Sequence, residues 1–137
     1  MMPVRCHLDA NVVLRFLRND DPKQSPAAAR LFEKAKAGRG HLFLSAVTVA
    51  ETFYVLVKVY GLTRTEAAGK LLPFIQSDVI AVESSSRVAD ALQRVARANV
   101  DFGDGYLAAT AAERGDKIVS FDEDMRVFAD VTTEAPV

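Results

Sequence analysis

The sequence has few of the features that mark disulfide-rich, membrane-spanning or strongly charged proteins. It contains one cysteine, Cys6, which excludes an internal disulfide framework and fits a reducing compartment. No apolar run approaches the roughly 18 residues of a membrane span, and the first residues lack the apolar region of a secretory signal. The net charge of −1 creates no strong overall field for nucleic acid or anionic membrane. We therefore expect a cytoplasmic protein without membrane contacts, with Cys6 packed in the core.

Several well-known catalytic signatures are also absent from the sequence. It has no Gly-rich phosphate loop and no dinucleotide-binding fingerprint. No Ser–His or Cys–His pair is evident, which argues against a covalent nucleophile of that kind. The two histidines, His7 and His41, lie within and just before expected strands and do not form a zinc-binding set. There are no internal repeats or low-complexity tracts that would indicate a repeat architecture or a long disordered region.

The periodicity of the hydrophobic residues indicates an α/β fold. The chain has 137 residues, of which 50% are hydrophobic, and this is enough for one domain with its own core. Short apolar runs predict strands at residues 4–8, 42–44, 79–82 and 117–121, with a small last strand at 131–132. Because helical patterns separate these runs, we predict a parallel sheet with helices on both faces. A single domain should span residues 1–132, followed by a frayed tail at residues 133–137.

Capping residues and helical periodicity predict the helices between the strands. We expect them at about residues 11–19, 25–37, 45–60, 63–75, 101–114 and 123–128, with a fifth that is capped by residues 84–86 and includes Arg97. Thr63 or Thr65 should cap the fourth, and Pro73 should bend or shorten it. The outer face of the fifth carries three arginines, which we expect to face water: Arg87, Arg94 and Arg97.

Four acidic residues lie where separate segments could bring them together. Asp9 and Asp122 directly follow expected strands, and parallel sheets bind ligands outside the carboxyl ends of their strands. Glu51 is the only charge between residues 46 and 57, so it is expected to point into an apolar or half-buried region, and Asp104 opens an alanine-rich helix. Buried carboxylates are costly unless a cation pairs with them. Because no matching Lys or Arg is evident, the sequence predicts that the four converge on a divalent metal.

Structural roles would also explain several of these acids. Asp9 and Asp122 could cap the helices that follow them. The spacing of Asp101 and Asp104 at a helix start resembles a capping box. Asp124 lies close enough to Asp122 to compete for a metal. Sequence reasoning alone leaves these alternatives open.

A site of oxygen ligands alone favours a hard cation and a particular class of reaction. Carboxylates select Mg²⁺ or Mn²⁺ rather than zinc. Such ions lower the pKa of bound water and offset the negative charge of a phosphodiester undergoing hydrolysis. The acidic constellation therefore predicts a metal-dependent phosphodiesterase.

Four short segments resemble the motifs of PIN-domain ribonucleases. Residues 8–13 (LDANVV) are similar to the opening motif of that family, and residues 45–51 (SAVTVAE) are similar to its second motif. Residues 101–111 (DFGDGYLAATA) resemble the third motif and residues 120–122 (SFD) the fourth. Each motif is short, but the four occur in order over nearly the whole chain. The size, with no appended domain, is similar to that of VapC toxins from type II toxin–antitoxin modules.

The resemblance implies specific expectations for fold and function. It implies a Rossmann-like parallel sheet of about five strands in the order 3-2-1-4-5. It implies Mg²⁺- or Mn²⁺-dependent endoribonuclease activity, with cellular RNA as the substrate. It also implies a homodimer and a cognate antitoxin that occupies the site. A non-catalytic RNA- or partner-binding domain on the same fold remains an alternative. A phosphohydrolase that uses an aspartyl nucleophile is disfavoured, because Asn11 replaces the second acid that it needs two residues after Asp9.

The resemblance also assigns roles to individual residues. The residues matching the family's catalytic acids are Asp9, Glu51, Asp104 and Asp122. Of these, the expected metal ligands are Asp9, Asp104 and Asp122. The residues expected to support them are Asn11, Ser120 and Asp101. One departure is that Asp104 lies between two glycines, where the family more often has bulkier residues.

Overall fold

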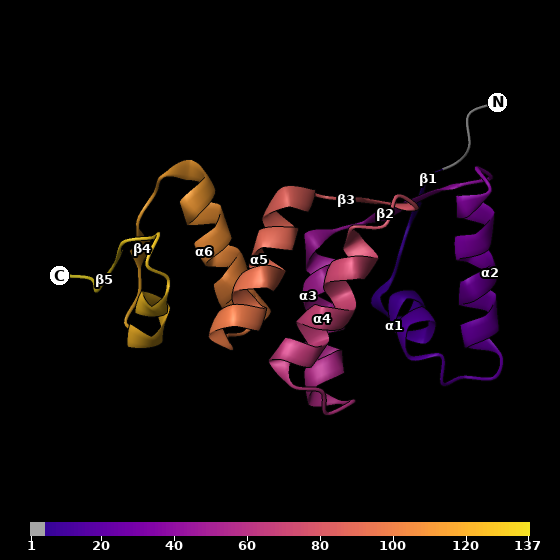
Figure 1. The fold of residues 1–137 in the computed structure, drawn as a ribbon, viewed down its shortest axis with the longest axis horizontal. Coiled ribbons are helices and arrows are strands. Elements are labelled where there is room, and N and C mark those ends of the chain that lie inside the picture. The colour runs from indigo at the N-terminus through magenta and orange to yellow at the C-terminus, as the bar shows by residue number, and fades with distance from the viewer. Residues whose placement is uncertain (1–4) are drawn as a thin grey trace.

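The computed structural model describes residues 5–137 and contains helices arranged in a row, with short parallel strands toward its two ends (Figure 1). The strands are β1 (Arg5–His7), β2 (His41–Leu44), β3 (Ile80–Val82), β4 (Ile118–Val119) and β5 (Thr133–Glu134). The α-helices are α1 (Ala10–Arg18), α2 (Gln24–Lys36), α3 (Ala46–Lys58), α4 (Arg64–Ile75), α5 (Ser85–Ala98) and α6 (Phe102–Arg114). A 3₁₀ helix, η1, covers Glu123–Val127. The α/β class and the order of the elements confirm the prediction.

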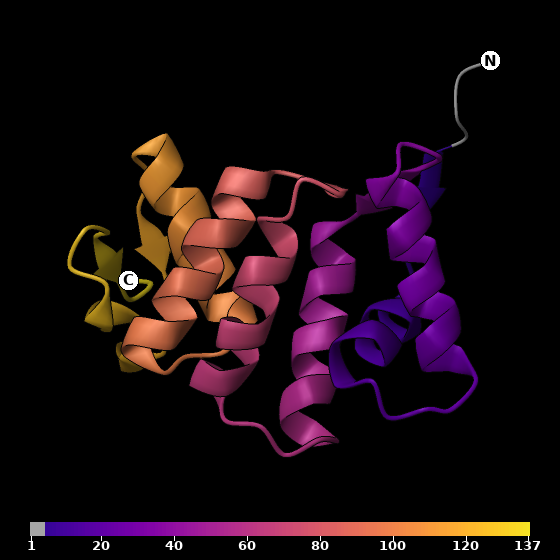
Figure 2. The same ribbon diagram turned by 45° about the vertical axis from the view of Figure 1, so that its right-hand side comes forward.

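The strands form two separate parallel sheets rather than one. In the first sheet β2 lies between β1 and β3, and in the second β4 pairs with β5. Both parts of the predicted order are therefore present, 3-2-1 and 4-5, but β1 and β4 are not paired within residues 5–137. The single five-stranded sheet in the order 3-2-1-4-5 is therefore not confirmed, because α3, α4, α5 and α6 lie between the two sheets (Figures 1 and 2).

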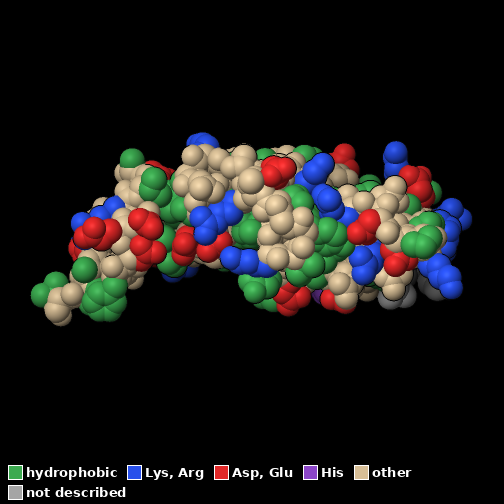
Figure 3. All heavy atoms as spheres, turned by 90° about the horizontal axis from the view of Figure 1, so that it is seen from below, with side chains coloured by type: hydrophobic (Ala, Val, Ile, Leu, Met, Phe, Trp, Pro, Cys, Tyr) green, Lys and Arg blue, Asp and Glu red, His purple; other side chains and the backbone are tan. Residues whose placement is uncertain are grey.

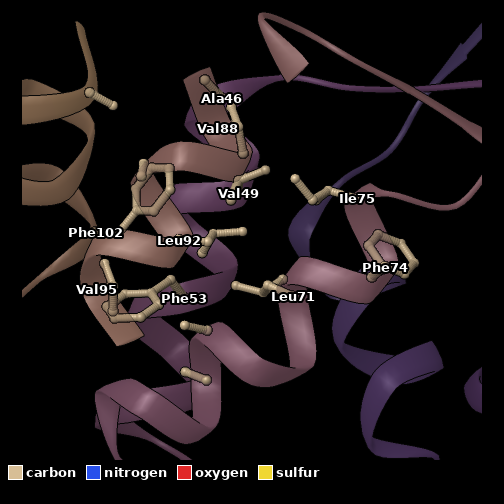
Figure 4. Close-up of a cluster of buried hydrophobic side chains, with 14 of the residues drawn as sticks. Ala46, Val49, Phe53, Leu71, Phe74, Ile75, Val88, Leu92, Val95 and Phe102 are labelled. Carbon is tan, nitrogen blue, oxygen red and sulfur yellow. The ribbon is translucent and has the colours of Figure 1, made fainter. Parts of the chain in front are cut away.

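Helix-to-helix packing forms most of the core. Figure 4 shows side chains from α3, α4, α5 and α6 meeting in one cluster. Val49, Leu71 and Leu92 are fully buried there, and Phe102 joins them from the start of α6. The apolar positions three and four residues apart on each helix form the stripes that meet in this cluster. The core thus fixes α6, whose first turn carries Asp104.

Local signals in the sequence set the ends of the helices. The side chain of Thr63 accepts a hydrogen bond from the backbone N–H of Glu66, 3.0 Å away, and Glu66 returns one to the N–H of Thr63 at 3.0 Å. This capping box selects Thr63 over Thr65 as the cap of α4. Pro73 lies in the last turn of α4, so it does not break the helix before Ile75. Within the described residues, no helix is long and apolar enough to cross a membrane.

Three other expectations differ from the structure. Arg94 is buried rather than facing water, because its guanidinium donates to Asp130 at 2.9 and 2.5 Å and to Asp90 at 3.1 Å. Cys6 is exposed rather than packed in the core, because the end of the molecule that carries β1 leaves all three β1 side chains exposed. The last strand, β5, begins at Thr133 and not at Val131, so it lies within the segment that was predicted to be a frayed tail. Pairing with β4 is what orders it.

Candidate functional site

The first group of candidate residues surrounds the carboxyl end of β1. Asp9 follows the strand and caps α1, because its Oδ1 accepts a hydrogen bond from the N–H of Ala10 at 2.8 Å. Together with Asn11 and Glu51, Asp9 lines a pocket of about 490 Å³ between α1 and α3. Tyr54 lies one helical turn after Glu51 and lines the same pocket. Both the capping role and the site role that the sequence suggested are compatible with this position.

Glu51 does not lie in the apolar environment that the sequence predicted. It is exposed, as are Val47 and Tyr54, four residues before it and three residues after it. The buried face of α3 is the opposite one, formed by Val49, Phe53 and other residues. A helix that is apolar nearly all round does not reveal in its sequence which face the core will cover, and this is the physical reason for the error.

The second group of candidate residues lies at the start of α6 and the end of β4. Asp101, Asp104 and Asp122 line a pocket of about 530 Å³ together with Glu123 and Asp124. Asp122 caps η1, since its Oδ1 accepts a hydrogen bond from the N–H of Asp124 at 2.9 Å. This turn places the carboxylates of the fourth motif beside those of the third.

Hydrogen bonds from neighbouring polar residues fix this second group. The N–H of Asp122 donates to Ser120 Oγ at 3.0 Å, so Ser120 holds the turn that presents Asp122. Arg64 Nε donates to Asp101 Oδ1 at 3.1 Å. Asp101 therefore faces an arginine and makes no side-chain cap to α6, so the capping-box reading of Asp101 and Asp104 was wrong. Sequence reasoning missed Arg64, because nothing local indicates that the first residue of α4 reaches the start of α6.

Asp104 is the carboxylate of this second group whose pKa is raised. Burial raises its pKa above the ordinary value, and the negative charges of Asp101, Asp122 and Asp124 raise it further, while Arg64 partly opposes them. A half-buried carboxylate with a raised pKa among other carboxylates indicates a site that a cation would stabilise. A divalent cation would remove the repulsion that raises this pKa.

The four predicted catalytic acids are divided between the two pockets. Asp9 and Glu51 lie in one, and Asp104 and Asp122 lie in the other, so the prediction that all four share one cleft does not hold for this chain. The oxygen donors suit Mg²⁺ or Mn²⁺ chemically. Among residues 5–137, however, no three His, Cys, Asp or Glu side chains come close enough to hold one ion. The donor chemistry fits a metal, but its arrangement in a single chain does not.

A comparison with protein families relates the residues of these two pockets to a known domain. The model of the PIN domain matches residues 7–131, which include all four acidic motifs. The chain belongs to the PIN domain family. PIN domains are generally nucleases that use a divalent metal, and membership indicates nuclease activity and nucleic-acid binding. A search of curated proteins finds no match.

Proposed function

We propose that this PIN domain is an endoribonuclease that depends on Mg²⁺ or Mn²⁺. In this proposal Asp9, Glu51, Asp104 and Asp122 are the catalytic residues, and all except Glu51 would hold the metal once the two pockets are brought together. The observation that carries the proposal is the pocket that Asp104 shares with Asp101, Asp122 and Asp124, in a chain whose family generally consists of metal-dependent nucleases. Four acids retained at the four motif positions also favour a working nuclease over a degenerate one.

The residues around the two pockets have distinct proposed roles. A bound divalent ion would supply a water of lowered pKa and positive charge against the scissile phosphate. Ser120 would hold the turn that presents Asp122, through its 3.0 Å hydrogen bond to that residue's N–H. Asp101 would keep Arg64 at the edge of the acidic pocket, where the guanidinium could bind a phosphate of RNA. Asn11 would contribute an amide beside Asp9.

The direct test is RNA cleavage by purified protein with Mg²⁺, with Mn²⁺ and with EDTA. Asp9→Asn should reduce the rate by about 100-fold or more, as loss of one charge-stabilising group typically does. The variant isolates the charge, because an asparagine side chain can still accept the hydrogen bond from Ala10 that caps α1. Asp116→Asn is the matched control, since Asp116 is an exposed carboxylate paired with Arg114 and lines neither pocket. Activity that survives EDTA, or an equal loss in both variants, would contradict the proposal.

We further propose that the enzyme is the toxin of a toxin–antitoxin pair and works as a homodimer. Support comes from the resemblance to VapC toxins and from α3, where Val47, Tyr54 and Val59 are exposed. Exposed apolar groups of this kind mark protein contacts. The antitoxin would bind with an Arg or Lys side chain in the acidic pocket, where a cation offsets the repulsion on Asp104. Induced expression should arrest bacterial growth, and Asp104→Asn should abolish the arrest at equal protein level.

The division of the four acids supports a second candidate function, a non-catalytic RNA- or partner-binding domain. Such a domain would need no gathered metal ligands, and within residues 5–137 no three are gathered. The same cleavage assay separates the two candidates, if RNA binding is measured in parallel. Binding without any metal-dependent cleavage would favour the second candidate.

A further inference from the structure

Two strands of this chain have an open hydrogen-bonding edge. Directly after β1, the N–H of Leu8 donates to the carbonyl of Phe43 in β2 at 2.9 Å. At β4, the N–H of Ile118 donates to the carbonyl of Thr132 at 2.9 Å, and the N–H of Ser120, directly after the strand, donates to the carbonyl of Glu134 at 3.0 Å. Backbone groups of successive strand residues point alternately to opposite sides. The N–H and C=O groups of His7 and Val119 therefore point away from these neighbours, toward edges that carry no other strand among residues 5–137.

The β4 edge is also apolar and poorly supported. Val119 is 60% exposed and Phe121 is 85% exposed, and both lie in the apolar run that predicted a strand. A two-stranded sheet of two-residue strands has little stability of its own. An open edge with exposed apolar side chains readily pairs with another strand. This end of the molecule therefore indicates a missing strand.

The two open edges lie toward opposite ends of the elongated chain. β1 lies on the side of α1 and α2, while β4 lies beyond α6, and the helices α3 to α6 separate them (Figures 1 and 2). The strand that each edge lacks is thus out of reach within the fold as it stands. A second copy lying antiparallel to the first would bring each β4 to the other's β1, and both edges would be covered by one twofold arrangement.

We propose that two copies of this chain form a dimer by exchanging strands. The β4 strand of each copy adds in parallel to the open edge of β1 in the other copy. Each sheet then becomes β3-β2-β1 followed by β4-β5 of the other copy. The same contact would bring the pocket of Asp9 and Glu51 in one copy to the pocket of Asp104 and Asp122 in the other. The catalytic consequence rests on the proposed nuclease function, whereas the pairing itself rests on the open edges.

Two independent considerations give the same register for the new pair of strands. Aligning Asp9 with Asp122, the acids that follow the two strands, sets Cys6 opposite Val119. In a parallel ladder, a residue whose backbone groups face the neighbour bonds to the residues on either side of its partner. The backbone groups of Val119 point toward the open edge, so they would bond to Arg5 and His7, the residues on either side of Cys6. This requires the backbone groups of His7 to point toward the open edge of β1, as they do. Cys6 and Val119 are both exposed, so both positions are accessible to the other copy.

Charge complementarity favours a second copy as the occupant. Residues 5–45 carry eight Lys and Arg against four Asp and Glu, a side-chain charge of +4. Residues 99–137 carry three against nine, a charge of −6. Figure 3 shows acidic side chains toward the end with β4 and β5, and Lys and Arg side chains at the opposite end. An antiparallel pair places each acidic end against a basic end, which favours this orientation over a parallel one.

Cross-linking tests the register directly. Cys6 is the chain's one cysteine, so Val119→Cys adds a single second thiol at the proposed contact. Treatment with a short bis-maleimide should link Cys6 of one copy to position 119 of the other, giving a covalent dimer in denaturing gels and two linkers per dimer by intact mass. The control is Cys6→Ser combined with Val119→Cys, which should give about tenfold less dimer, because thiols held together react at high effective concentration.

Each outcome decides the proposal. A linker joining both thiols within one chain would show that the chain closes on itself, and would overturn it. Equal dimer yields with and without Cys6, or no linked product, would overturn it too. Light scattering of the unsubstituted protein covers the case in which Val119→Cys impairs folding. A dimer at micromolar concentrations that weakens as salt rises is expected, and a strict monomer would refute the exchange.

Complementation tests the shared site, and its failure differs from a failure of the nuclease proposal. Asp9→Asn and Asp104→Asn should each be inactive, but a mixed dimer would contain one site with both native acids. Co-expression in equal amounts should restore roughly a quarter of the wild-type rate, because half the dimers are mixed and one of their two sites is intact. No recovery beside an active wild type would overturn the shared site. An inactive wild type that still cross-links would refute the nuclease proposal and leave the strand exchange standing.

Discussion

The contact between α5 and α6 at Gly105 makes a sharp prediction about the position of Asp104. A Cβ atom added at Gly105 would lie 2.7 Å from the backbone oxygen of Ala91 and 3.1 Å from Cγ2 of Val95. A backbone oxygen cannot rotate away, so Gly105→Ala would push α6 from α5. Such overpacking typically costs about 1–3 kcal/mol, against a gain of roughly 1 kcal/mol in helix propensity.

We therefore expect Gly105→Ala to reduce the free energy of unfolding by up to about 2 kcal/mol. Gly103→Ala is the matched control in the same helical turn, because a Cβ there meets nothing within 4 Å. It should be neutral or stabilise by up to about 1 kcal/mol. Urea denaturation with an unchanged m-value measures both. If Gly105→Ala is as stable as Gly103→Ala, the close approach of the two helices is not what the geometry indicates.

Three further predictions concern stability. Asp130→Asn should cost about 1–2 kcal/mol at neutral pH, because it leaves the buried Arg94 without its bidentate partner, although Asp130 is itself largely exposed. The hydrogen bond with Arg94 lowers the pKa of Asp130 in the folded protein. The stability that this ion pair contributes is therefore present above the unfolded pKa of about 4 and is lost as pH falls through the lower folded pKa. The melting temperature of the variant should accordingly fall less steeply in acid than that of the unsubstituted protein. Thr63→Ala should lose about 1 kcal/mol in urea denaturation through the capping box with Glu66, and Thr63→Ser should recover most of it. Millimolar Mg²⁺ should raise the melting temperature, and Asp104→Asn should remove that rise; an unmoved melting curve would mean that the carboxylates bind no metal.

The helices and strands could be predicted from sequence because their signals are local. Asp9, Ser45 and Thr63 all cap helices as their residue types favour, and Asn19 ends α1 in the left-handed conformation that asparagine tolerates. Gly115 ends α6 in the same conformation. These features depend on a few neighbouring residues, and their positions therefore agree with the structure to within one or two residues.

The errors arose where distant segments decide the outcome. Arg94 is buried because Asp130, which lies 36 residues later, accepts hydrogen bonds from its guanidinium. The sequence around Arg94 does not indicate such a distant partner. Likewise, the apolar run around Val119 predicts a strand but not which strand it will pair with. The candidate acids could be named from their motifs. Their division between two pockets could not, since it depends on whether β4 meets β1.

Assembly and metal binding should be coupled if the two pockets meet across a dimer. Burial and three neighbouring carboxylates already raise the pKa of Asp104, and the exchange would add Asp9 and Glu51 of the second copy. Each further pair of charges at about 4 Å costs on the order of 4 kcal/mol at an effective dielectric of 20, before solvent and protons relieve it. A divalent cation bound among these carboxylates removes that cost, so by linkage it must strengthen the dimer as much as dimerisation strengthens metal binding. The Mg²⁺-dependent rise in melting temperature should accordingly grow with protein concentration. A site confined to one chain would give a rise that is independent of concentration.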